Sequence, residues 1–135
     1  MSIEEEVFAS PSVSEVVRRT VEGVLAAAGA KGGELPLLII EAVKGAVEGG
    51  AEVAADASET ARGIMIGVLG VAQGADAEDA IVLVTKTLRD EVSKYGWDLA
   101  GATRGLVLGA VEAAPAAGIQ AERVIELVHE SMRNG

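Results

Sequence analysis

Apolar residues along this chain are spaced by three and four positions, which is the spacing of helices that bury one face. Ile81, Val84, Leu88 and Val92 follow this rule, and the spacing outweighs the strand preference of the many valines. Glycine, proline and acidic residues interrupt the pattern at regular distances. The sequence therefore predicts an all-α fold without strands, with helices over residues 12–29, 34–50, 56–73, 77–94, 98–114 and 120–133.

Local signals mark the ends of these helices. Ser12 with Glu15, and Asp56 with Glu59, have the spacing of capping boxes, in which a side-chain oxygen accepts a hydrogen bond from a free backbone N–H group. Breaks are expected at 29–33, at 74–76 and at 115–118, where glycine supplies left-handed backbone conformations and Pro115 ends a helix.

The predicted helices form an internal repeat. Residues 62–69 recur 42 positions later as 104–111, and residues 77–89 recur 44 positions later as 121–133. A more divergent copy occupies 12–50, so each unit is a helical hairpin, with units at about 12–54, 55–97 and 98–135. Residues 11–135 are expected to form a single helical-repeat domain of three tandem hairpins. A short α-solenoid and a closed helical bundle bury the same positions, so both alternatives stay open.

Residues 1–10 precede the first cap and contain three consecutive glutamates at 4–6. We expect them to be a flexible acidic arm, or a lead-in from which Val7 and Phe8 dock on the first hairpin.

Composition and charge narrow the classes of function. The chain carries 21 acidic and 11 basic residues, a net charge of −10, which would repel nucleic acids and anionic bilayers. It has no cysteine, and its longest apolar run, 35–40, is far too short to span a membrane. The N-terminus has no signal-peptide pattern. We therefore expect a cytoplasmic protein with no nucleic-acid partner and no transmembrane segment.

Glycines inside the helices are the most unusual feature. Gly63 and Gly67, and likewise Gly101, Gly105 and Gly109, are four residues apart, so each set lines one stripe of its helix. Each glycine costs about 1 kcal/mol relative to alanine in a helix interior. A stripe of this kind lets a second backbone come near and gain close contacts. Two interpretations stay open: a self-association surface, or packing against the partner helix of the same hairpin, which we favour.

Arg18, Arg62 and Arg104 occupy the same position in the three units. They fit a ladder for an anionic ligand or an acidic partner helix. Alternatively, they pair with acidic residues of the preceding unit or lay their stems over apolar surface, and the acidic composition favours this structural interpretation. Trp97 lies with Tyr95 in the loop between the second and third units. We expect Trp97 and Tyr95 to fill the gap between these two hairpins, or, if exposed, to anchor a partner.

Residues with catalytic or metal-binding chemistry are sparse. Glu126 and His129 have the Glu-x-x-His spacing of di-iron bundles, but no second such motif exists, so we interpret His129 as a solvated helix-end residue. Acidic groups at 4–6, 76–79 and 90–91 lack the spacing of a calcium loop. No phosphate-binding loop and no nucleophile with a base are present. We predict no catalytic, cofactor-binding or metal site and no enzymatic activity.

Residues 61–69 and 103–112 resemble segments of uncharacterised bacterial proteins with Ala/Gly-rich helical repeats, a resemblance that implies no activity. A looser compositional likeness is to phasins, which coat storage granules. Our leading hypothesis is a non-catalytic structural or interaction protein that self-associates through Gly/Ala-striped helices as a ring or filament. The alternative is an amphipathic-helix coat or binder for an apolar surface or ligand, and a small helical enzyme ranks third. The candidate surface residues are Gly63, Gly67, Gly101, Gly105, Gly109, Arg18, Arg62, Arg104 and Trp97.

Overall fold

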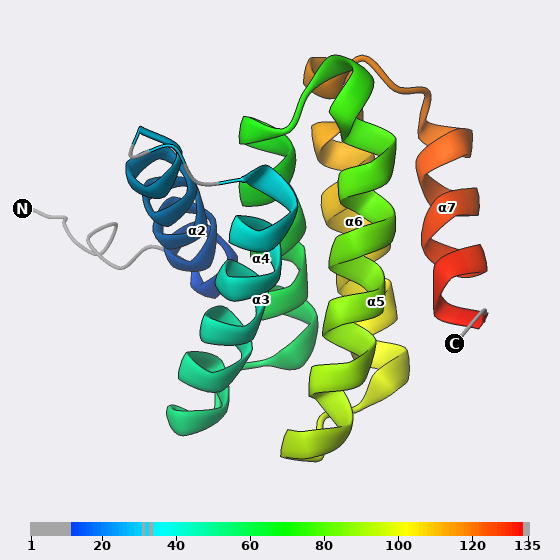
Figure 1. Cartoon of the computed structure of the whole chain (residues 1–135). Helices are drawn as coiled ribbons and strands as arrows, with labels where there is room; N and C mark the ends of the chain where they lie inside the picture. The colour runs from blue at the N-terminus through cyan, green and yellow to red at the C-terminus, as the bar shows by residue number, and fades with distance from the viewer. Residues whose placement is uncertain (1–11, 31, 33, 134–135) are drawn as a thin grey trace, which may run out of the picture.

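The computed structural model describes residues 12–30, 32 and 34–133, which form six α-helices and no strand (Figure 1). The helices are α2 (Val13–Ala30), α3 (Leu35–Glu52), α4 (Ala57–Val71), α5 (Ala77–Tyr95), α6 (Leu99–Ala117) and α7 (Ala121–Arg133), with a 3₁₀ turn η1 (Gly74–Asp76) before α5. Each predicted helix is present, and its ends agree within three residues. The predicted arm at 1–10, with Val7 and Phe8, lies outside the described residues.

The caps that the sequence predicts are in place. Ser12 Oγ accepts a hydrogen bond from the Glu15 N–H at 3.2 Å, and Asp56 Oδ1 accepts one from the Glu59 N–H at 2.9 Å. Helix α5 ends at Gly96, whose φ of 69° is a left-handed conformation that favours glycine. The local signals therefore account for where these helices begin and end.

The predicted end of the fifth helix at residue 114 is wrong, because α6 continues through Pro115 to Ala117. Proline has no N–H group and removes one hydrogen bond of the helix. Pro115 lies in the last turn, where the N–H of Gly118 bonds back to the carbonyls of Ala114 and Pro115. The N–H of Ile119 also bonds to Ala114 O at 3.0 Å. These bonds hold the last turn despite the proline.

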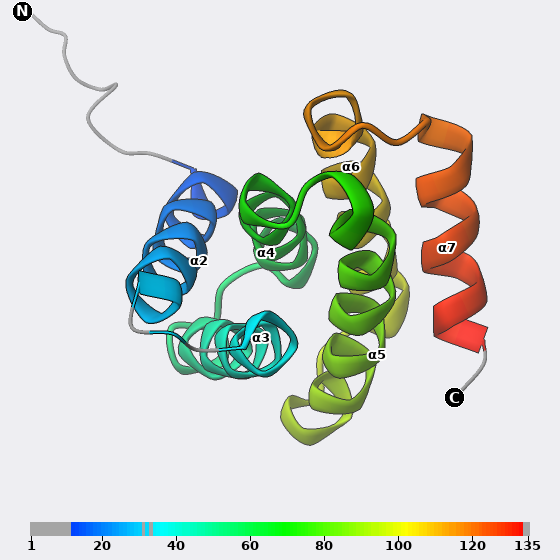
Figure 2. The ribbon, with the colours of Figure 1, turned by 45° about the horizontal axis from the view of Figure 1, so that its top comes forward.

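The helices lie in two rows (Figure 2). The first helices of the three hairpins, α2, α4 and α6, pack in sequence, so that α4 contacts both of the others. The second helices, α3, α5 and α7, form the other row, with α5 in contact with α3 and α7. This arrangement is that of a short α-solenoid.

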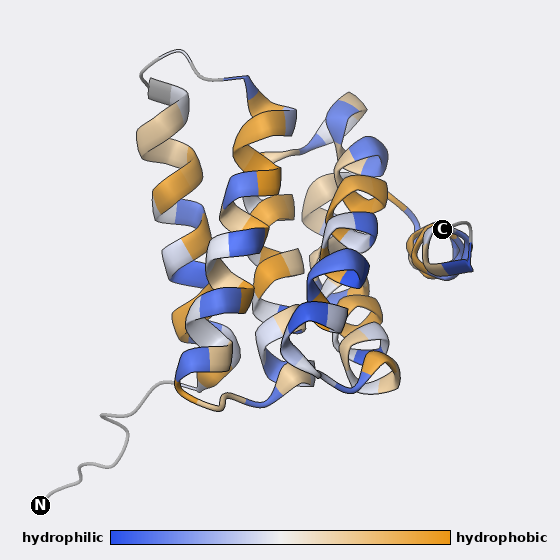
Figure 3. Cartoon of the chain, turned by 60° about the horizontal axis from the view of Figure 1, so that its bottom comes forward, coloured by the Kyte–Doolittle hydropathy of each residue, from blue (hydrophilic) through white to orange (hydrophobic). Residues whose placement is uncertain are grey.

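The core lies between the two rows. Both rows contribute large side chains that are fully buried: Leu25, Ile64 and Leu106 from the first row, and Val43, Leu88 and Val128 from the second. Hydrophobic and hydrophilic residues are interspersed along the helices (Figure 3). No helix in the described part of the chain has both the length and the apolar character to cross a membrane.

Candidate functional site

Two glycines of α4 lie directly against α2. A Cβ atom placed on Gly63 would lie 2.8 Å from Val17 Cβ, and one on Gly67 would lie 3.0 Å from the backbone oxygen of Arg18. Carbon atoms of ordinary side chains do not approach other atoms so closely. Glycine at these two positions therefore allows the backbones of α4 and α2 to approach each other.

The same contact recurs between α6 and α4. A Cβ atom on Gly105 would lie 2.8 Å from the carbonyl carbon of Ser58, and one on Gly109 would lie 2.6 Å from the carbonyl oxygen of Arg62. We call the residues that receive the glycines the ridge of each helix. The ridge is Ser14, Val17, Arg18 and Val21 on α2, and Ser58, Ala61, Arg62 and Met65 on α4.

These contacts correct the expectation that the glycine stripes pack inside one hairpin. They join the first helices of neighbouring hairpins. Gly63, Gly67, Gly105 and Gly109 are all buried between helices of the same chain, so none of them is open to a second molecule. Gly101 is also buried, and its closest side-chain neighbour is the N-cap residue of its own helix.

Two of the three repeated arginines are paired within the chain. Arg18 donates hydrogen bonds to Glu15 at 2.6 Å and to Glu22 at 2.9 Å, both on α2. The bond to Glu15 is the main cause of the raised pKa of Arg18, and Arg18 in turn lowers the pKa of Glu15. Arg62 pairs with Glu59 on its own helix and with Glu112 on α6, and the bond to Glu112 raises its pKa.

Arg104 is the exception. It is exposed, and within residues 12–30, 32 and 34–133 it has no ion-pair partner. Glu15 and Glu59 lie three residues before their arginines, whereas the position three residues before Arg104 is Gly101. Intramolecular pairing is therefore present in the first two units, but its acids lie on the same helix or in the following unit and not in the preceding one. For Arg104 the described residues show no such pair.

Trp97 fills space between helices, as the sequence predicts. It is half-buried and packs against the core, and its ring would lie 3.3 Å from a Cβ atom on Gly50 of α3. The same expectation is wrong for the neighbouring Tyr95, which is 37% exposed. Trp97 is therefore used in packing and is only partly available to a partner.

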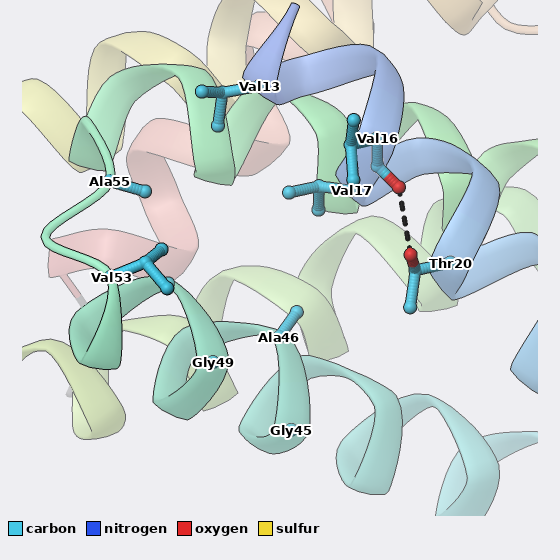
Figure 4. Close-up of a pocket in the computed structure, with 10 residues that line it drawn as sticks. Val13, Val16, Val17, Thr20, Gly45, Ala46, Gly49, Val53 and Ala55 are labelled. Carbon is cyan, nitrogen blue, oxygen red and sulfur yellow. Dashed lines mark hydrogen bonds between the residues drawn. The ribbon is translucent and has the colours of Figure 1, made fainter. Parts of the chain in front are cut away.

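An open apolar groove of about 350 Å³, which the repeat pattern did not predict, separates α2 from α3 (Figure 4). Its walls are formed mainly by Val13, Val16 and Val17 of α2, by Gly45 and Gly49 of α3, and by Val53, the residue that follows α3. A Cβ atom on Gly45 or Gly49 would meet no atom of the described residues within 4 Å, so these residues leave the floor of the groove empty. The four-residue spacing of these two glycines was the available sequence signal.

Other polar side chains near the helix surfaces form ion pairs or are exposed. Glu91 is buried and pairs with Lys94 at 2.8 Å beside a hollow of about 300 Å³ between α3 and α5, and this bond raises the pKa of Lys94. His129 is exposed on α7, and Glu126 pairs with Arg123 at 2.5 Å. Among the residues that the structure places, no three His, Asp or Glu side chains are grouped to hold a metal ion.

The chain matches no protein-family model, and no curated protein or solved structure was found to be similar to it. The resemblance to bacterial Ala/Gly-rich repeat proteins and the likeness to phasins therefore stay predictions. The surfaces of the chain itself are the basis on which a function can be proposed.

Proposed function

We propose that this protein is a non-catalytic structural or interaction protein that associates with copies of itself in the cytoplasm. The observation that supports this proposal is apolar exposure at both ends of the helical array. At the α2–α3 end, Val16 is 47% and Val53 74% exposed, and on the last helix of the first row Leu99 and Leu108 are each 46% exposed. Repeat arrays need a polar cap at each end to stay separate, and exposed apolar patches favour association.

The two ends differ in shape and residues, so a contact between them is heterologous. Contacts of this kind form a closed ring or an open filament. The net charge of −10 opposes association through long-range repulsion. Because salt screens this repulsion, association is expected to strengthen as the salt concentration rises.

Sedimentation equilibrium across a wide range of protein concentration tests this proposal. The expected result is a mass that rises above the 13.7 kDa of one chain, with rings or fibres in negative-stain images. A mass that stays at one chain at every concentration and salt condition would contradict the proposal.

A second candidate function is binding of an apolar ligand or surface. The groove between α2 and α3 favours it, because its volume of about 350 Å³ falls within the range of about 300–1,000 Å³ typical of ligand pockets. Titration with a fluorescent alkyl-chain probe and with neutral lipid vesicles tests this function. Saturable binding that filling of the groove abolishes would support it, and the absence of binding to both would contradict it.

A further inference from the structure

The contact between α6 and α4 depends on three residues of α6 at a fixed spacing. Gly105 and Gly109 bring the α6 backbone onto the ridge of α4, and Glu112 accepts a hydrogen bond from Arg62 of that ridge. The pattern is Gly, three residues, Gly, two residues, Glu. It supplies both the close approach and the matching charge.

Helix α3 carries the same pattern on an open surface, at Gly45, Gly49 and Glu52. The two glycines form the floor of the α2–α3 groove, and no atom of the residues that the structure describes lies within 4 Å of where their Cβ atoms would be. Glu52 is exposed, and the ion pairs of the described residues do not include it. On a helix, these three residues share one stripe.

Helix α6 carries an open ridge that matches this pattern. Its ridge positions, 42 residues after those of α4, are Ala100, Thr103, Arg104 and Val107. Ala100 and Arg104 are exposed, Thr103 and Val107 are half-buried, and Leu108 beside them is 46% exposed. Arg104 has the place of Arg62 in the ridge but has no carboxylate to pair with among the described residues.

We infer that copies of this chain associate head to tail, with the α2–α3 groove of one copy seated on the α6 ridge of the next. Gly45 and Gly49 meet the ridge as Gly105 and Gly109 meet α4, and Glu52 accepts a hydrogen bond from Arg104 of the neighbouring copy. This inference rests on the proposed self-association and specifies its surfaces. It repeats, on the second-row helix α3, the glycine and carboxylate pattern of the α6–α4 contact within the chain.

Helix α2 does not offer an equivalent surface for the ridge. Counting back 44 residues from Gly63 and Gly67 leads to Arg19 and Gly23. A side chain at the Gly63 position would overlap the backbone of the ridge, so Arg19 prevents α2 from stacking on the ridge as α4 and α6 do. Helix α3, by contrast, has two open glycines at this spacing in the groove.

Filling the groove floor tests the inference. The double substitution Gly45→Leu with Gly49→Leu adds side chains at two open positions, so the helical content is expected to persist by circular dichroism. Self-association is expected to weaken at least about tenfold, because an overpacked contact is strongly unfavourable. Gly29→Leu is the matched control, since Gly29 is also an exposed glycine of a helix with nothing within 4 Å, and it should associate like the unaltered protein.

Exchanging the charges tests the pairing separately. Arg104→Glu and Glu52→Arg should each weaken self-association about tenfold, because each places like charges opposite one another. Mixing the two variants should restore it, since every groove then meets a ridge of opposite charge in an alternating assembly. Lys86→Glu, an exposed site on α5, is the control for the change in net charge.

The outcomes separate the inference from the proposed function. If the unaltered protein stays a single chain, both fail. If it associates but the glycine and charge variants associate equally well, the self-association stands and this interface is wrong. If the mixed charge variants stay apart, the pairing of Arg104 with Glu52 is wrong.

Discussion

Arg62 on α4 holds Glu112 of α6 with its guanidinium group, while its own backbone oxygen is the atom that Gly109 approaches. One residue therefore makes both the polar and the close-packed part of the contact between two hairpins. The side chain fixes the partner by charge, and the backbone requires glycine opposite it. Together they set the register in which α6 lies on α4.

Substitution of buried and open helix glycines should have opposite effects on stability. Gly105→Ala should lower the free energy of unfolding by about 1–3 kcal/mol, because the added methyl group overlaps the α4 backbone. Gly49→Ala, at an open position, should raise it by about 0.5–1 kcal/mol through better helix propensity. Urea denaturation of both variants measures the two effects, and a shift in the same direction for both would contradict the packing.

The pair between Arg62 and Glu112 should contribute only modestly to stability. Their side chains are 32% and 42% exposed, and ion pairs in such settings contribute about 0.2–1 kcal/mol. A double-mutant cycle with Arg62→Ala and Glu112→Ala should give a coupling energy in this range that falls at high salt. No coupling at low salt would show that the pair plays no part in holding α6 on α4.

At acid pH, the contribution of Glu15 to the stability of the fold should be lost. Hydrogen bonds and charge attraction from Arg18, helped by Arg19, hold the pKa of Glu15 below its ordinary value of 4.5. A lowered folded-state pKa stabilises the fold above pH 4.5, and this stabilisation is lost as the pH falls through the folded-state value. Glu15→Gln should therefore be less stable than the unaltered protein at neutral pH, with the difference shrinking in acid. A difference in unfolding free energy that does not vary with pH would contradict this assignment.

The hydrogen bond that Asp56 accepts at the start of α4 should contribute more to stability than is usual for an exposed residue. Asp56→Ala leaves the Glu59 N–H without its acceptor and should cost about 1 kcal/mol, whereas Asp56→Asn should cost much less. Thermal unfolding compares the variants, and amide exchange at Glu59 reports the bond itself. Equal stability of the alanine and asparagine variants would mean that this hydrogen bond is not stabilising.

The six helices can be predicted from the sequence because their signals are local. Spacings of three and four residues set the buried faces, and caps such as Asp56 set the ends. The end of α6 was missed because a proline in the last turn costs one hydrogen bond, which Gly118 and Ile119 compensate with bonds of their own. Local signals predict most of a helix well. Whether its last turn forms depends also on hydrogen bonds made by the residues beyond that turn.

The helix that each glycine stripe contacts cannot be predicted from local signals. Helical periodicity shows that Gly105 and Gly109 share a stripe, but not which helix they meet. The contact with α4 is set by the stacking of hairpins, which involves residues more than 40 positions apart. The open surface on α3 was missed because the first unit has diverged, so Gly45, Gly49 and Glu52 fall outside the repeat as it is aligned from sequence.

Directed cross-linking tests most directly whether the internal interface recurs between copies. Within the chain, Glu112 of α6 and Arg62 of α4 form an ion pair across the interface. The corresponding residues of two neighbouring copies are Glu52 and Arg104. The chain has no cysteine, so a Glu52→Cys variant mixed with an Arg104→Cys variant should be joined into a dimer of the two by a short bifunctional thiol reagent. If that mixture cross-links no faster than Glu52→Cys mixed with Arg133→Cys, the head-to-tail interface is contradicted.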